Sequence, residues 1–196
     1  MYEIIHERRS IRRFEDRSVP RLILDRVLDA ALWAPSAHNR QPWRFIVISN
    51  PATRTNLADA MAARLTADLR ADGLAEDMIL KDTNRSRQRI SGAPIVIVTC
   101  LTMAEMDEYP DARRAAFEHQ MAVQGVAMAA QNLLLAAHAE GLGACWVCAP
   151  LFCQDTVRDV LNLSSDLEPQ GLILVGYPGE QREKTREPLE TRVTFR

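Results

Sequence analysis

The sequence carries almost no net charge. Its 24 Lys and Arg residues nearly balance its 26 Asp and Glu residues, which leaves a net charge of -2 over 196 residues. General binding to nucleic acid requires a basic field that neutralises many phosphates. The balance therefore excludes that function class, and any site for an anion must be a local cluster of cations.

Long hydrophobic runs are also missing. The first 14 residues are charged from the third position and lack the apolar core of a signal peptide. The longest apolar stretch, residues 121–137, is interrupted by Gln124, Gln131 and Asn132. We therefore expect no membrane association and a cytoplasmic location.

Cysteines are few, and the sequence lacks the additional ligands that a metal site requires. They stand at positions 100, 145, 148 and 153, and no second C-x-x-C or histidine pair supplies further zinc ligands. Cys145 and Cys148 belong to a predicted strand, where an offset of three places side chains on opposite faces. We expect reduced cysteines, no metal and a reducing compartment.

What is present is the composition of an ordinary globular protein. With 47% hydrophobic and 26% charged residues and no internal repeat, the chain predicts one domain, residues 1–196. Apolar periodicity and turn signals predict an α+β fold with a mixed or antiparallel sheet. We expect helices at 21–32, 50–72, 115–139 and 153–163, a helix with a surface loop at 73–91, buried strands at 43–49 and 95–101, strands at 143–147 and 171–178, and a charged tail.

Residues 115–139 are apolar on more than one helical face. Such a helix is expected to be buried on all sides. In a domain of this size, that burial is easiest if a second copy covers one face, so the segment predicts the centre of a dimer. Gly141 is placed to end the helix as a C′ glycine.

Two clusters of basic residues are candidates for an anion site. Residues 8–13, "RRSIRR", combine four arginines with a hydroxyl, and guanidinium groups bind phosphate through paired hydrogen bonds. A solvated basic helix end is the alternative interpretation. Lys184 and Arg186 are two residues apart and share one side of an extended chain, although a charged tail explains them equally well.

Two further segments have an open interpretation. The stretch 33–45, "WAPSAHNRQPWRF", is either an ordinary loop that leads Trp43 into the core or a polar loop that offers Ser36 and Asn39 to a planar ligand. In "GLGACWV", residues 141–147, two glycines permit close approach of another body, but a helix stop also explains Gly141.

Together these segments resemble one family. The motifs "RRSIRRF", "APSAHNRQPWRFIV", "GLGACWV" and "GYP" followed by "KTREPLE" are similar, in this order and nearly end to end, to the FMN-dependent nitroreductases. The resemblance implies a nitroreductase-like α+β fold in which the sheet packs on the long buried helix. It also implies an intertwined homodimer with two FMN molecules at the interface, each contacted by both chains.

The resemblance also assigns residues to the cofactor. It implies that one chain holds most of the flavin, and that a polar segment of the other chain lies against the ring through Pro35, Ser36, Ala37, Asn39 and Gln41. The phosphate and ribityl contacts correspond to Arg8, Arg9 and Ser10, and the basic pair that completes the phosphate site corresponds to Lys184 and Arg186.

The remaining cofactor positions concern the ring itself. Arg12 corresponds to the residue at the pyrimidine edge, where a cation favours the anionic reduced flavin. The strand residues along the ring, with an amide near N5, correspond to Trp146, Val147 and Cys148. The best-known bacterial members have a glutamate at the position of Cys148, so this chain departs from them there.

The activity implied is a ping-pong oxidoreductase. NADH or NADPH delivers hydride to flavin N5, and a nitroaromatic, quinone or related small molecule then removes it. No catalytic side chain is required, and no Ser-His-Asp set or carboxylate pair is expected. A non-catalytic flavin storage or sensor dimer and a structural dimer without flavin are the alternatives from other classes.

Several long segments resemble a narrower group. "RLTADLRADGL", the stretch from Tyr109 to Val147, "FCQDTVRDVLNL" and "LEPQGLILVGY" are similar to the nitroreductase-like C-terminal domain of the actinobacterial deazaflavin coenzyme (F-420) gamma-glutamyl ligase. This similarity implies reduction of a dehydro-deazaflavin, with Asp68 close to that substrate. The chain lacks a ligase domain, and its "SAHNRQPWRF" is closer to general nitroreductases.

Overall fold

A computed structural model describes residues 1–196 and shows one antiparallel sheet. Its four strands are β1 (Trp43–Ile48), β2 (Ile95–Leu101), β3 (Gly143–Val147) and β4 (Glu168–Gly176), in the spatial order β1-β2-β4-β3. Of the two sheet types that the sequence leaves open, the antiparallel one is present.

The two central strands form the core of the sheet. Every residue of β2 is buried, as are all but the first of β4, because helices cover both faces of the sheet. Strand β1 lies at an edge, and only Trp43 and Ile48 are buried in it. The prediction of a buried strand at 43–49 is therefore wrong for its middle residues.

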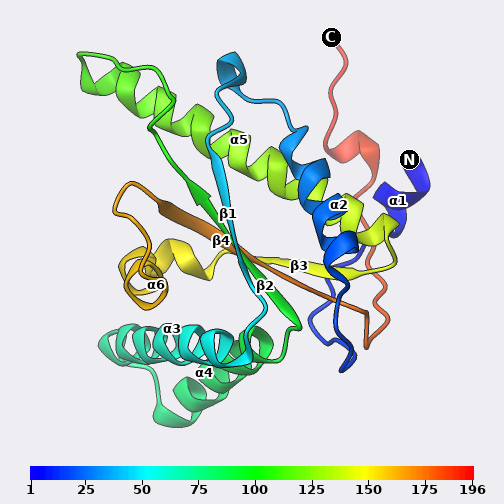
Figure 1. Ribbon diagram of the computed structural model, residues 1–196, viewed down its shortest axis with the longest axis vertical. Helices are drawn as coiled ribbons and strands as arrows, with labels where there is room; N and C mark the ends of the chain where they lie inside the picture. The colour runs from blue at the N-terminus through cyan, green and yellow to red at the C-terminus, as the bar shows by residue number, and fades with distance from the viewer.

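Helices cover the sheet in two groups (Figure 1). On one face lie α2 (Arg21–Leu32) and α5 (Ala112–Ala139), whose apolar side chains share a cluster with β3 and β4. On the other lie α3 (Pro51–Ala71), α4 (Glu76–Ser91) and α6 (Gln154–Leu161), which form the second large cluster. The sheet is thus the middle layer of three.

The region between α3 and β2 is more regular than the sequence indicates. Helix α3 begins after Asn50, whose side chain accepts a hydrogen bond from the Thr53 amide at 3.1 Å. The chain reverses at Gly73, which has a φ of 78°. Residues 76–91 then form one helix, so the predicted surface loop in this region is absent.

Helix α5 has one buried side and one exposed side. Asp111 caps its start by accepting from the Arg114 amide, and Gly141, with a φ of 75°, follows its end as predicted. Leu133 is fully buried, but Phe117 is 52% and Met128 38% exposed. Burial on all sides is therefore wrong for a single chain, which leaves an apolar stripe open.

The N-terminal segment runs beside β3. After α1 (Tyr2–Glu7), Ser10 pairs in parallel with Ala144, and the Ile11 amide donates to the Ala144 carbonyl at 3.1 Å. Gly143 permits this approach, since a Cβ there would lie 2.8 Å from the Ile11 side chain. Residues 179–196 leave the body as a projecting tail (Figure 1). No helix is long and apolar enough to cross a membrane.

Candidate functional site

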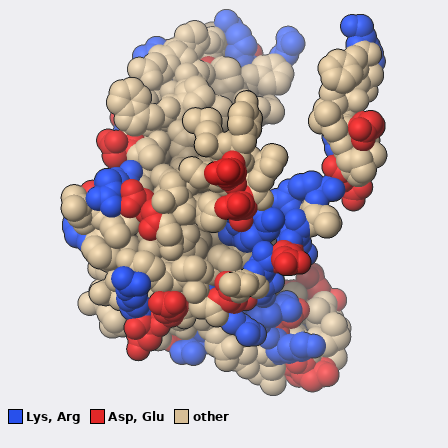
Figure 2. All heavy atoms as spheres, turned by 90° about the vertical axis from the view of Figure 1, so that its right-hand side faces the viewer, with Lys and Arg blue, Asp and Glu red and all other residues tan.

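A pocket of about 210 Å³ gathers basic residues from both ends of the chain. Figure 2 shows Lys and Arg side chains massed beside the base of the projecting tail. The pocket has no apolar lining residue. It contains all five residues that the sequence predicts for the phosphate site, and also Arg12, which the sequence assigns to the ring. Its lining consists of Arg8, Arg9, Ser10, Arg12, Arg182, Lys184 and Arg186.

The charges in this pocket are not neutralised within the chain. None of the five predicted cations forms an ion pair; of the lining residues only Arg182 does, with Glu180. Partial burial lowers the pKa of Arg8, and the nearby charges of Arg186 and Arg9 lower it further. The Nε of Arg9 is buried without a partner. Converging cations with an unused donor fit a terminal phosphate.

Glu180 joins the two basic segments. Its carboxylate accepts a hydrogen bond from the Arg12 amide at 2.8 Å and pairs with Arg182 at 2.9 Å. The hydrogen bond from Arg182, assisted by that from the Arg12 amide, lowers the Glu180 pKa to about 2. This bridge fixes the start of the tail against residues 10–13.

A second arginine pocket, of about 220 Å³, adjoins the first and shares Arg12 and Arg182 with it. Helix α4 supplies Arg85 and Arg89, and partial burial followed by the charges of Arg85 and Arg12 lowers the Arg89 pKa. Sequence reasoning missed these residues. Their i, i+4 spacing places them on one helical face, a signal that the expected loop obscured.

The end of β3 carries the three predicted ring-side residues. The Trp146 indole lies against Gly171, where a Cβ would be 2.5 Å from the ring, and its Nε1 donates to Cys148 Sγ at 2.9 Å. Val147 is half-buried, while Cys148 lies just beyond the strand and is exposed. Since the indole is held within the protein, this strand end offers its main chain and the Cys148 thiol to a ligand.

The two cysteines of the C-x-x-C motif are differently placed. Cys145 is buried, and burial raises the pKa of its thiol, whereas Cys148 is exposed. No group of three or more His, Cys, Asp or Glu side chains is arranged to hold a metal ion.

The polar segment 35–41 has an unusual backbone. It contains the short helix η1 (Ala37–Asn39), and His38, Asn39 and Gln41 have φ values of 49°, 55° and 53°. Left-handed conformations cost roughly 1–2 kcal/mol for residues other than glycine. The Ser36 hydroxyl accepts from the Gln41 amide at 3.0 Å, which helps to hold this shape.

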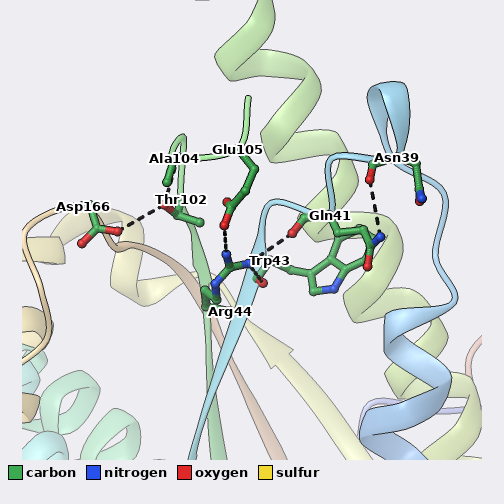
Figure 3. A network of polar contacts seen from close by, with 8 residues as sticks. All are labelled: Asn39, Gln41, Trp43, Arg44, Thr102, Ala104, Glu105 and Asp166. Atoms are coloured by element: carbon green, nitrogen blue, oxygen red, sulfur yellow. Dashed lines mark hydrogen bonds and ion pairs between the residues drawn. The ribbon is translucent and has the colours of Figure 1, made fainter. Parts of the chain in front are cut away.

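Partly exposed neighbouring side chains hold the same segment (Figure 3). Arg44 donates to the carbonyl oxygens of Gln41 at 3.2 Å and Trp43 at 2.8 Å, and it pairs with Glu105. Arg40 pairs with Asp107, and Pro42 and Ser36 lie beside Gly125 of α5. A backbone held so firmly in a costly conformation is typical of a binding site.

The anchored segment presents its polar residues outward. Pro35, Asn39 and Gln41 are exposed, and Ser36 and Ala37 are half-buried. None of these five residues lines either arginine pocket. A single chain therefore brings the predicted phosphate residues together beside β3, where Ser10 pairs with Ala144, but leaves segment 35–41 outside both arginine pockets.

Asp68 lies apart from the arginine pockets, in a cavity of about 260 Å³ between α3 and the chain that follows β3. Its carboxylate accepts from Arg64 Nε at 3.2 Å. Ala149, the residue after Cys148, lines the same cavity. The predicted substrate residue thus lies close to the predicted ring-side strand end.

Comparison with known proteins places this arrangement in a family. A model described as "Nitroreductase family" matches residues 5–177. The chain belongs to the nitroreductase family. The family prediction and the nitroreductase-like fold are therefore confirmed.

The relatives of this nitroreductase-family chain cover it almost completely. An NADH dehydrogenase of Thermus thermophilus is 33% identical over 205 residues, covering 97% of this chain and 93% of its own. A Methanothermobacter thermautotrophicus protein, assigned as NADH dehydrogenase/NAD(P)H nitroreductase, is 33% identical over 184 residues, covering 91% of this chain and 77% of its own.

Solved structures agree with this placement. A protein of Desulfovibrio desulfuricans, assigned as a nitroreductase and solved in complex with FMN, has 28% identity and a TM-score of 0.76. The match covers all of this chain and 95% of that one. This chain therefore shares its fold with a relative that binds FMN, and it contains the basic pocket described above.

Proposed function

We propose that this protein is an FMN-dependent oxidoreductase that passes hydride from NADH or NADPH to a nitroaromatic, quinone or related small acceptor by a ping-pong mechanism. The observation that carries the proposal is the pocket in which five cations without acidic partners converge, and whose N-terminal residues belong to the segment that pairs with β3 through Ser10 and Ala144. Names of relatives add support, since they include NADH dehydrogenase and NAD(P)H nitroreductase.

FMN, when bound, would supply two-electron hydride chemistry. The chain's residues bind and orient. Arg8, Arg9, Ser10, Lys184 and Arg186 hold the phosphate end through charge-assisted hydrogen bonds.

The ring end is held differently. Arg12 and Arg89 line the same pocket, and their positive charge would favour the reduced, anionic form of a flavin held there. The main chain of residues 146–148 positions the other edge. No side chain is required to act as an acid or base.

The homodimer is part of the proposal. Segment 35–41 does not reach the arginine pockets of its own chain, and α5 exposes Phe117 and Met128. A second copy that covers this stripe would bring its Pro35, Ser36, Ala37, Asn39 and Gln41 to the ring held by the first. Residues 1–196 would then act as one FMN-binding domain that completes its site by pairing.

The location and the narrower relationship are also proposals. All four cysteines are free thiols, which is typical of a reducing compartment such as the cytoplasm. The deazaflavin alternative depends on the sequence resemblance of the central segments and on Asp68, and neither relative named above is called a deazaflavin enzyme.

The test is anaerobic reduction of the FMN-loaded protein, followed by the flavin absorbance. NADH or NADPH should bleach the flavin, and a nitroaromatic or quinone should then restore the absorbance rapidly. Failure to bind FMN, or to be reduced by either nicotinamide, would contradict the proposal. Reduction followed by slow reoxidation with every acceptor would instead indicate a storage or sensor protein.

A further inference from the structure

The cavity that contains Asp68 differs in character from the two arginine pockets. Most of its lining is apolar, and Met61, Leu65 and Leu69 of α3 form one wall. Opposite them lie Ala149 and Phe152, whose side chain is 76% exposed at the mouth. An exposed phenylalanine beside a concave apolar wall offers a surface on which a planar ring can stack.

The cavity lies where an acceptor has to bind. Ala149 directly follows Cys148, the end of the segment assigned to the flavin N5 edge, and Ser86 lines the cavity one residue along α4 from Arg85 of the second arginine pocket. The cavity is therefore next to both protein edges that we assign to the ring. This step depends on the proposed function.

Its size limits the ligand. The volume is about 260 Å³, below the range of roughly 300–1,000 Å³ typical of pockets for larger ligands. One aromatic ring or two fused rings fit such a space. A tricyclic deazaflavin with its ribityl phosphate does not fit without part of it remaining outside.

Its charge limits the ligand further. Arg64 is the only cation in the lining, and it is engaged by Asp68 at 3.2 Å and by Asp155 at 3.1 Å. Asp72 also lines the cavity and forms no ion pair. The thiol of Cys153 is buried, and burial raises its pKa, so it adds no charge at neutral pH. The lining thus has two carboxylates and one guanidinium, and Asp155 pairs with that guanidinium from outside the lining, so the lining residues carry a net negative charge.

We infer that this cavity is the acceptor site and that it selects small aromatic acceptors that are neutral or positively charged over anionic ones. The carboxylates of Asp68 and Asp72 repel an anionic acceptor, and Phe152 with the α3 wall binds its ring. The same charge that admits a neutral quinone or a nitrobenzyl cation disfavours a deazaflavin, which carries phosphate and carboxylate groups.

The experiment uses three nitroaromatics of nearly equal size and different charge: 4-nitrobenzylamine, 4-nitrobenzyl alcohol and 4-nitrobenzoate. Each is titrated into oxidised, FMN-loaded protein without nicotinamide, and the Kd is read from the perturbation of the flavin spectrum. The KM in turnover with the better nicotinamide is measured in parallel. Binding is thus observed separately from reduction.

The parent protein should bind the amine more tightly than the alcohol, and the alcohol more tightly than the benzoate, with steps of about three- to tenfold that shrink as salt is raised. Asp68→Asn combined with Asp72→Asn should bring the Kd of the benzoate to within about threefold of the alcohol. Phe152→Ala should weaken all three by about tenfold.

The matched control is Asp59→Asn, since Asp59 is also on α3 but pairs with Arg87 outside this cavity. It should leave the order of the three ligands unchanged. Benzoate that binds the parent as tightly as the amine, or a charge order that survives the double Asn variant, would overturn the inference. If either contrary result is found and nicotinamide still reduces the flavin normally, the assignment of the acceptor site is wrong but the proposed function stands. If nicotinamide does not reduce the flavin, the proposed function itself is contradicted.

Discussion

The first arginine pocket and the polar segment 35–41 are the two halves of the proposed flavin site. In a single chain the residues of the pocket lie together, whereas the segment lies apart from them. The pocket is assembled from residues about 175 positions apart and is complete in one copy. The segment is equally well ordered, with three residues of positive φ held by its own chain, yet its exposed polar side faces no pocket cation. The pocket residues thus lie together in one copy, and we propose that segment 35–41 serves the site of another copy.

The difference follows from what each region contacts. The pairing of Ser10 with Ala144 and the bridge through Glu180 hold the basic segments beside β3. Segment 35–41 is instead anchored beside the 102–107 loop and α5, through Arg40 and Arg44. The same α5 exposes an apolar stripe next to it, so coverage of that stripe and use of the segment should be a single event.

The largest expected effect comes from removing the second copy. Ala127 is exposed on α5 in the single chain, and Ala127→Glu would place a charge in the proposed interface without disturbing the chain's own core. We expect monomers that lose FMN, because each site then lacks segment 35–41. Sedimentation with simultaneous absorbance of protein and flavin measures both.

The control for this variant is Ala52→Glu, on an exposed position of α3. It should remain dimeric and yellow. A monomeric Ala127→Glu protein that retains FMN at full affinity would contradict the account, because FMN binding would then not need segment 35–41 of a second copy.

An intermediate effect is expected from substitutions in the first arginine pocket, whose residues all come from one chain. Arg8→Ala or Arg186→Ala removes a charge-assisted contact worth roughly 1.5–3 kcal/mol, or about ten- to a hundredfold in FMN affinity, and should leave the dimer intact. Fluorescence titration of the apoprotein with FMN measures the loss. Arg21→Ala, which removes only a surface pair with Asp25, is the matched control; equal affinity in all three variants would remove the phosphate assignment.

The smallest effect concerns the bridge at Glu180. Its pKa of about 2 is below the ordinary 4.5, so its ionised form stabilises the folded state above about pH 4.5, and this contribution disappears as the pH falls toward 2. Glu180→Gln should therefore lower the stability of the apoprotein slightly at pH 6, and the difference from the parent should shrink below about pH 4.5 and disappear near pH 2. Urea unfolding at several pH values tests this; a difference that grows toward low pH would contradict it.

Local patterns predicted most of the elements. The limits of α2 and β3 agree with the predicted ranges, because a Pro before the helix and glycines before the strand mark their starts. The prediction of a helix with a surface loop at 73–91 is correct for the helix and wrong for the loop, because residues 76–91 form the single helix α4. Its buried residues are few, Ile79, Thr83 and Ile90, so the apolar pattern alone does not fix where this helix begins and ends.

The site could be predicted only in part. The family resemblance named six residues of the first arginine pocket, but it did not identify Arg182 in that pocket or Arg89 in the second one. For α5, composition predicts burial on all sides, with one face covered by a second copy, but composition alone cannot tell which face belongs to the core and which to an interface. Met128 and Leu133 have similar hydrophobicity, and only the position of the sheet decides which of them is exposed.

The most direct measurement of the central claim, that each flavin site is divided between two copies, uses mixed dimers. One chain carries Arg8→Ala with Arg186→Ala, and the other carries Ser36→Ala with Asn39→Ala, so that neither homodimer has an intact site. If the halves belong to different chains, the heterodimer contains one wholly intact site, and it should bind one FMN per dimer with parental affinity. If each site is built from one chain, no intact site exists in any dimer, and a heterodimer that binds FMN no better than the two homodimers would contradict the account.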